Sequence, residues 1–251
     1  MIGSRSVEVG KTYFTVRANE SETPVPVYGI SASQQIQGIR QKPYGDYILN
    51  KDVTLGSELS INGGTLYGKL DLQGHTLTNT SLDTIFDAVG SAAKRQGTVY
   101  NGTLAVKAIR STKDIRIIGS NYGTLENINF KIDAQNPYSG SGTDKVYDNS
   151  RWASEVYSCM LWNNYGTIQN FTMEYQSDLV GCSRTGFIYD NYGLVQDGYI
   201  YGEGALMGGS RVGGIASYNT SKGTIRNIYS TIDVRANVTS SLGGNVSTLY
   251  S

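Results

Sequence analysis

The stretch that decides the fold is Gly123-Thr124-Leu125-Glu126-Asn127-Ile128-Asn129-Phe130, because similar octapeptides recur along the chain. Each copy has an aliphatic residue two positions after its opening glycine and Asn or Asp four positions after it. The copies begin at Gly97, Gly123, Gly166, Gly193 and Gly223, so successive spacings are 26, 43, 27 and 30 residues. Three spacings are close to one period, and the spacing of 43 is one period plus an insertion.

The pattern within a copy is that of a strand that turns a corner. Apolar residues alternate through Ile128, Phe130 and Ile132, which is typical of a strand with one buried face. The alternation slips by one residue at the Asn or Asp, a residue type that tolerates the left-handed backbone conformation. We therefore expect these side chains to form a ladder at a corner of stacked coils: Asn101, Asn127, Asn170, Asp197 and Asn227. The opening glycine is expected to have a positive φ in a tight turn.

A unit of about 27 residues with two or three short strands must stack on its neighbours to bury its apolar face. The repeat therefore predicts an all-β protein, a right-handed parallel β-helix, and five copies of one motif disfavour the alternative of a β-sandwich. We assign residues 1–45 to an N-terminal cap with short strands and a short helix. Residues 46–251 are assigned to the β-helix, with an inserted loop at about 134–158.

Two short helices are predicted at the N-terminal side of the chain. Ser33 is a candidate N-cap for a helix through Arg40 that covers the first coil with Ile36 and Ile39. The spacing of apolar residues predicts a second helix over residues 82–94. No capping segment is recognisable at 240–251, so we expect the coils to continue in a longer polypeptide or in further modules.

Composition excludes several classes of protein. The chain has 251 residues, 39% of them hydrophobic, and its 21 basic and 21 acidic residues give zero net charge. That balance disfavours a nucleic-acid-binding protein, and no apolar run is long enough for membrane insertion. One histidine and two cysteines exclude most zinc sites and any histidine triad not built on His75. We expect no cofactor and no metal.

One segment carries a family resemblance. Val212-Gly213-Gly214-Ile215-Ala216-Ser217-Tyr218-Asn219, followed by the octapeptide at Gly223 and by Thr231-Ile232-Asp233-Val234, resembles a GLUG-type repeat. Such repeats occur in bacterial surface and secreted proteins, including the N-terminal regions of M26-type IgA-specific metallopeptidases. The resemblance extends over about residues 40–240. It implies a β-helix that is extracellular or on the bacterial cell surface. The His-Glu-x-x-His signature of the peptidase domain is absent.

The acidic residues do not form a recognisable catalytic set. A glycosidase needs two carboxylates on adjacent coils, and the candidates are Asp144, Asp148, Glu155, Asp190 and Asp197. Lys145 and Arg151 are candidate lyase bases, and residues 143–149 have calcium-ligand types without the EF-hand spacing. We interpret all of these as solvated loop or turn residues. The chain is therefore expected not to be an enzyme.

Tyrosine is the enriched residue type with binding chemistry. Tyr122, Tyr165 and Tyr192 each precede a repeat glycine, so they are predicted to stack along one edge, either as plain structural stacking or as a binding surface. The insertion adds further aromatic and charged side chains, and insertions in solenoids often bind ligands. The candidate ligand-binding residues are Tyr138, Tyr147, Arg151, Trp152, Trp162, Tyr165 and Tyr192.

Three functional hypotheses remain open. The first is a non-catalytic extracellular β-helix module that binds a host glycoprotein or glycan, or acts as a spacer. The second is a substrate-recognition domain of a larger secreted protease. The third is a phage tail or spike component acting on polysaccharide, which the start at Met1 without a signal peptide slightly favours.

Overall fold

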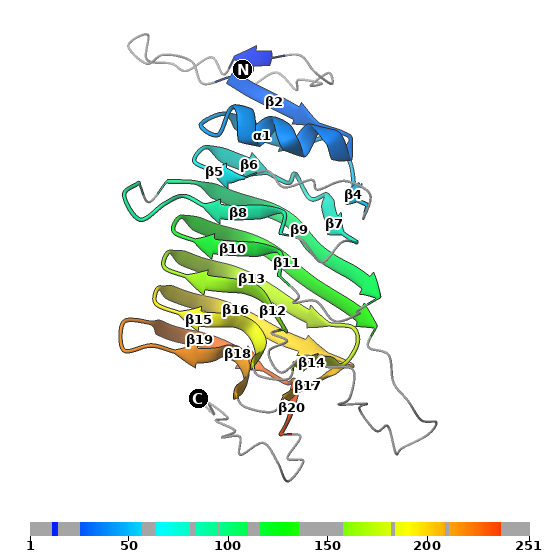
Figure 1. Cartoon of the computed structure of the whole chain (residues 1–251), viewed down its shortest axis with the longest axis vertical. Helices are drawn as coiled ribbons and strands as arrows, with labels where there is room; N and C mark the ends of the chain where they lie inside the picture. The colour runs from blue at the N-terminus through cyan, green and yellow to red at the C-terminus, as the bar shows by residue number, and fades with distance from the viewer. Residues whose placement is uncertain are drawn as a thin grey trace.

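The chain forms a parallel β-helix in which strands of successive coils stack along one axis (Figure 1). This computed structural model describes residues 12–14, 26–56, 64–80, 84–94, 96–109, 116–135, 158–181, 184–208 and 211–236. The predicted all-β class and parallel β-helix are confirmed.

The largest sheet forms one wall of the rod. Its parallel strands, in stacking order, are β3 (Asp46–Leu49), β6 (Lys69–Asp71), β9 (Thr98–Ile109), β11 (Thr124–Gln135), β13 (Thr167–Tyr175), β16 (Leu194–Gly202) and β19 (Thr224–Ser230). β2 (Pro26–Ile30) pairs in parallel with β3, and β1 (Thr12–Phe14) pairs antiparallel with β2. The short strands β4 (Val53–Leu55) and β7 (Thr76–Asn79) pair with each other, and β7 also pairs with β9.

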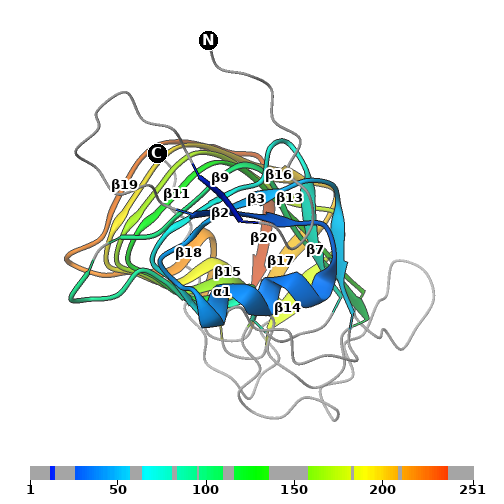
Figure 2. The same cartoon turned by 90° about the horizontal axis from the view of Figure 1, so that it is seen from above.

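Among the described residues, two smaller sheets form further sides of the rod, the third only on its C-terminal coils. The second sheet contains β5 (Thr65–Leu66), β8 (Phe86–Val89), β10 (Ile118–Asn121), β12 (Ser158–Asn164), β15 (Arg184–Asn191) and β18 (Arg211–Asn219). The third sheet contains β14 (Leu179–Gly181), β17 (Ala205–Gly208) and β20 (Asp233–Ala236). Viewed along the axis, these sheets surround a common interior (Figure 2).

The core consists of columns of apolar side chains held in register by the parallel pairing. Leu125 lies between Val99 and Ile168 of the neighbouring coils, and all three are fully buried. A second part of the core is aromatic, since the Phe187 ring lies 4.8 Å from the Phe130 ring and 5.2 Å from the Phe171 ring. A repeat that cannot bury its own apolar face thus buries it against the coils on either side.

The predicted corner is present on five coils. The Asn or Asp of each octapeptide has a φ between 51° and 60°, the left-handed conformation expected there: Asn101, Asn127, Asn170, Asp197 and Asn227. Adjacent corner side chains are hydrogen-bonded at two steps, from Asn127 to Asn101 at 3.3 Å and from Asn227 to Asp197 at 3.0 Å.

The role expected of the repeat glycine needs correction. Gly97 has a positive φ of 105°, whereas Gly123, Gly166 and Gly193 do not. A Cβ atom on Gly166 would instead overlap the carbonyl oxygen of Gly123, and one on Gly193 would overlap that of Gly166. Glycine is required at these positions because the backbones of neighbouring coils approach each other closely.

The N-terminal helix lies across the end of the first coil (Figure 2). It consists of a 3₁₀ turn, η1 (Ser33–Ile36), followed by α1 (Gln37–Gln41), and it buries Ile36 and Ile39 as predicted. The N-cap is Ala32, not Ser33, and the Gln35 side chain accepts hydrogen bonds from the backbone N–H groups of Ser31 and Ala32.

The second predicted helix is wrong where the structure describes it. Residues 86–89 form β8, which pairs in parallel with β5 and β10. Phe86 and Val89 are both buried although they are three residues apart, because the burial pattern of this short strand does not alternate strictly. That spacing imitates one face of a helix. None of the helices in the described ranges is long and apolar enough to span a membrane.

Candidate functional site

The candidate site is a corner of the rod at which three consecutive strands of the second sheet are each followed by a tyrosine. Tyr122, Tyr165 and Tyr192 directly follow β10, β12 and β15, and their backbone N–H groups each donate to a carbonyl oxygen of the preceding coil at 2.7 Å. The ring centroids of Tyr122 and Tyr165 are 4.7 Å apart, and those of Tyr165 and Tyr192 are 4.8 Å apart. The predicted stack is therefore present, and we call these three residues the tyrosine edge.

Stacking determines which parts of these rings a ligand can reach. The rings of the tyrosine edge are within 12° of parallel, so each inner face is covered by the next ring. The accessible groups are the ring edges and hydroxyls, and they recur once per coil. Burial, the neighbouring hydroxyls of Tyr122 and Tyr192, and the charge of Asp190 all raise the pKa of Tyr165. Its hydroxyl is a neutral donor and acceptor at physiological pH.

A second stack lies toward the N-terminal end of the same corner. The Tyr44 and Tyr67 rings are 4.8 Å apart, and the Lys94 ammonium group lies 3.3 Å from the Tyr44 hydroxyl oxygen. On the coil between this stack and the tyrosine edge, the residue at the equivalent position is Gly90, which has no side chain to stack. Its backbone N–H donates to the carbonyl oxygen of Leu66. The two stacks are consequently separate.

A buried asparagine ladder supports the tyrosine edge from inside. Asn121 donates to Asn164 at 2.8 Å, Asn164 donates to Asn191 at 2.8 Å, and Asn191 donates to Asn219 at 2.7 Å. The side-chain oxygen of Asn121 also accepts from the backbone N–H of Gly123, which fixes the turn that carries Tyr122. Our reasoning from sequence missed this ladder, although the triplet Asn-Tyr-Gly recurs at residues 121, 164 and 191.

Trp162 lies beside the tyrosine edge, on strand β12. Its ring stacks on Tyr189 of β15 at 5.3 Å, and the Arg116 guanidinium lies 4.5 Å from the Trp162 ring centroid. Arg184 covers Tyr189 at 4.2 Å and also forms an ion pair of 2.6 Å with Asp190. Trp162 therefore belongs to a half-buried stack of arginine and aromatic side chains, three residues before Tyr165 on the same coil.

The other four predicted ligand-binding residues belong to the insertion. The inserted segment predicted at about 134–158 lies between β11, which ends at Gln135, and β12, which begins at Ser158. The residues concerned lie outside the described part of the chain: Tyr138, Tyr147, Arg151 and Trp152. The acidic candidates of the insertion lie outside it as well: Asp144, Asp148 and Glu155.

The acidic candidates on the coils have structural contacts. Asp190 is paired with Arg184, and Asp197 accepts a hydrogen bond from Asn227 at the corner. His75 lies 3.5 Å from Asp52, which also accepts from the backbone N–H of Thr76. Among the described residues, no three His, Cys, Asp or Glu side chains come together as metal ligands.

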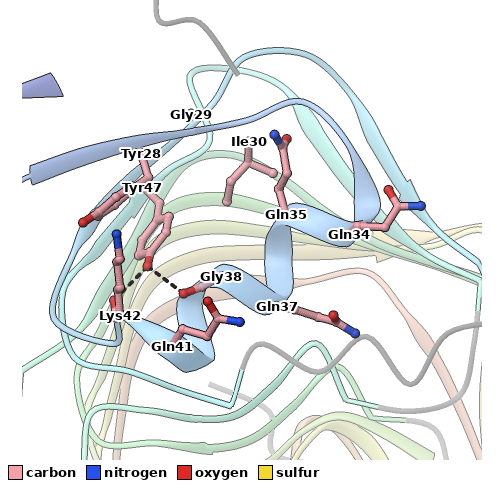
Figure 3. A pocket seen from close by; sticks show the side chains of 10 residues that line it. All are labelled: Tyr28, Gly29, Ile30, Gln34, Gln35, Gln37, Gly38, Gln41, Lys42 and Tyr47. Atoms are coloured by element: carbon pink, nitrogen blue, oxygen red, sulfur yellow. Dashed lines mark hydrogen bonds between the residues drawn. The ribbon is translucent and has the colours of Figure 1, made fainter. Parts of the chain in front are cut away.

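A pocket of about 330 Å³ lies between β2 and the N-terminal helix (Figure 3). Its walls include the stacked rings of Tyr28 and Tyr47 and the ammonium group of Lys42, 4.6 Å from the Tyr28 ring centroid. The Tyr47 hydroxyl donates to the carbonyl oxygen of Lys42 at 2.7 Å and lies 3.2 Å from that of Gly38. Burial, and to a smaller extent the nearby Tyr28, raises the pKa of Tyr47. The remaining polar side chains of the lining are glutamines, so the pocket has hydrogen-bonding groups but no carboxylate or thiol: Gln34, Gln35, Gln37 and Gln41.

Comparison with known families places one motif on this fold. The family model of the GLUG motif matches residues 208–235, which begin at the last residue of β17 and include β18, β19 and most of β20. The match corresponds to one coil of the rod and coincides with the segment whose sequence resembles a GLUG repeat. Comparison with curated proteins and with solved structures gave no match. The chain is thus a parallel β-helix in which one coil, residues 208–235, matches the GLUG motif.

Proposed function

We propose that this chain is a non-catalytic, extracellular binding module that holds a glycan, or the glycan of a host glycoprotein, along its tyrosine edge. The observation that carries the proposal is the stack of Tyr122, Tyr165 and Tyr192 on consecutive coils. The GLUG motif supports the extracellular setting, because such repeats occur in surface and secreted proteins.

The spacing of the tyrosine edge suits a polymer of sugars. Coils of a β-helix repeat at about 4.8 Å, roughly the length of one pyranose unit. Each coil therefore presents one hydroxyl and one ring edge per sugar along the axis. Tyrosine provides this contact area at a small cost in side-chain entropy. The ladder of buried amides holds the turns in place before the ligand arrives, which reduces the ordering cost of binding.

The two acidic candidates on the coils, Asp190 and Asp197, support a non-catalytic role. Asp190 and Asp197 are engaged in an ion pair and in the corner hydrogen bond, respectively. A glycosidase would need two carboxylates aimed at a shared bond. The module can act alone on a cell surface or within a longer secreted protein, including a protease.

Binding of the folded chain to a broad glycan panel tests the proposal. The key variant carries Tyr122→Phe, Tyr165→Phe and Tyr192→Phe together, which keeps the stacked rings and removes only the hydroxyls. The matched control carries the same change at Tyr199, Tyr201 and Tyr229, a separate tyrosine cluster on β16 and β19. We expect the wild type and the control to bind a glycan that the key variant loses.

Two results would contradict the proposal. Equal binding by the key variant and the wild type would remove the tyrosine edge from recognition. A well-folded wild-type chain that binds nothing on the panel would leave the β-helix as a spacer.

A further inference from the structure

Arginine side chains are packed on aromatic rings along the second sheet, next to the tyrosine edge. The guanidinium carbon of Arg116 lies 4.5 Å from the Trp162 ring centroid. The corresponding distance is 4.2 Å for Arg184 over Tyr189 and 4.7 Å for Arg211 over Tyr218. The rings belong to β12, β15 and β18, which are consecutive strands of that sheet (Figure 1). We call the three cations the arginine row: Arg116, Arg184 and Arg211.

The arginine row has more positive charge than the described residues around it neutralise. Arg184 and Arg211 lie directly opposite each other in the register of β15 and β18, an arrangement that costs stability for like charges. Asp190 pairs with Arg184, whereas the described residues form no ion pair with Arg116 or Arg211. Three guanidinium groups and one carboxylate leave an excess of two positive charges in a chain whose net charge is zero.

The packing of these guanidinium groups suits anions. A guanidinium that lies flat over a ring is held by the ring quadrupole, and its N–H groups still point outward along its edge. That edge matches the oxygens of a carboxylate or a sulfate in a bidentate hydrogen bond. Arg116 and Arg211 are both partly exposed, and Tyr218, on which Arg211 is packed, is 45% exposed.

The arginine row and the tyrosine edge are formed by residues of the same coils, about 10 Å apart along the strands. Tyr189 and Tyr192 are three residues apart on the same coil, and Trp162 and Tyr165 have the same separation on the preceding coil. The charge of Asp190 is close enough to contribute to the raised pKa of Tyr165. A chain of sugars lying along the tyrosine edge would therefore have its acidic substituents within reach of the arginines.

We propose that the ligand is an acidic glycan and that the arginine row recognises its carboxylate or sulfate groups. This inference rests on the proposed function, which it narrows to one class of sugar.

Binding by four probes of similar length tests this inference: polygalacturonate, a heparin oligosaccharide, dextran and oligo-dT. The key variant is Arg116→Gln with Arg211→Gln, which spares the ion-paired Arg184. The matched control is Arg40→Gln with Arg226→Gln, the same change in charge at residues away from the row. Circular dichroism and the unfolding midpoint establish that each variant is folded.

We expect at least one acidic glycan to bind about tenfold or more tighter than dextran, with an affinity that falls as salt rises. Loss of two charge-assisted contacts should weaken that binding about tenfold or more in the key variant. The control should stay within about twofold of the wild type. Arg211→Lys should bind less tightly than the wild type, because lysine keeps the charge but lacks the planar fork.

Several outcomes would overturn the inference. Oligo-dT binding as tight as that of the acidic glycans would show a general polyanion surface. Equal weakening in the control would show a long-range charge effect. If neutral glycans bind in a salt-independent way and only the tyrosine variant loses them, the inference fails while the proposed function stands. Absence of binding to all glycans contradicts both.

Discussion

Two rows of asparagine run along the rod, and the same residue type serves a different purpose in each. In the buried ladder, Asn121, Asn164 and Asn191 are fully inaccessible to solvent and are joined by hydrogen bonds of 2.7 to 2.8 Å that reach Asn219. In the corner row, the side chains of Asn127 and Asn227 are exposed, and their bonds to the neighbouring coil are 3.3 and 3.0 Å long.

The buried row is determined by side-chain hydrogen bonding, whereas the corner row is determined by backbone conformation. A buried amide is costly unless both its donor and its acceptor are satisfied, so the inner row depends on every neighbour. The corner row has water as an alternative partner. Its asparagines are needed because each residue there has a φ near 55°, which most side chains disfavour. We therefore expect the inner row to be sensitive to side-chain chemistry and the corner row to be sensitive to backbone preference.

The largest effect is expected in the middle of the buried ladder. Asn164→Leu removes the acceptor of the Asn121 amide and the donor to the Asn191 oxygen. Two buried hydrogen bonds of 2.8 Å are lost, and the Asn121 amide and the Asn191 oxygen each keep only a bond of 3.3 Å, to the Thr167 carbonyl oxygen and from the Gly193 N–H. The free energy of unfolding should therefore fall by about 2 to 5 kcal/mol. Urea unfolding measures this change. A loss below about 1 kcal/mol would show that the ladder is not a hydrogen-bonded unit.

The tyrosine edge should come next, because its stability depends on ring contact and not on the hydroxyl. Tyr165→Ala removes two stacked contacts and should cost about 1 to 3 kcal/mol. Tyr165→Phe keeps both contacts and should leave the unfolding midpoint close to that of the wild type. Equal destabilisation by the two variants would assign the stability to the hydroxyl instead.

In the corner row, substitution by alanine should destabilise the chain more than substitution by glycine. Asn127→Ala places an ordinary side chain at a φ of 53° and should destabilise the chain by about 1 to 2 kcal/mol. Asn127→Gly should cost less than Asn127→Ala, because glycine adopts this conformation readily. The unfolding midpoints of the two variants check the order. The reverse order would mean that side-chain hydrogen bonds, as in the buried ladder, dominate the corner.

The smallest effect concerns a charge on the outer face of the large sheet. Partial burial opposes ionisation of Glu174, but hydrogen bonds from Gln176 and Lys131, the charge of Lys131 and a hydrogen bond from Tyr201 outweigh it and lower the pKa of Glu174. The ionised form therefore stabilises the fold at neutral pH, and this contribution is lost as the pH falls through the lowered pKa.

Lys131→Met tests that contribution because it removes a 3.1 Å ion pair to Glu174. The variant should be slightly less stable than the wild type at pH 7, and the difference should shrink on acidification below the pKa of Glu174. Thermal unfolding at several pH values would show this. A difference that stays constant with pH would attribute the effect to packing of the lysine side chain.

Much of this architecture could be predicted from the sequence. The repeat Gly-x-aliphatic-x-Asn or Asp predicted the corner and its left-handed residues, since the backbone of each coil needs a positive φ at the same position. The tyrosine stack followed from the position of Tyr122, Tyr165 and Tyr192 before the repeat glycine. The helix predicted around Phe86 and Val89 was wrong because pairing with β5 and β10, and not local spacing, determines its conformation.

The recurrence of one motif was thus sufficient to specify a parallel β-helix, its period and the residues at its exposed corner, because these depend on local backbone preference and on the need of each coil to bury one face. Contacts between side chains far apart in the sequence required the folded chain. Asn121 and Asn164 are 43 residues apart, and Arg184 and Arg211 meet only because β15 and β18 pair in one particular register. That register depends on how many coils pack together, so it cannot be predicted from the sequence of a single repeat.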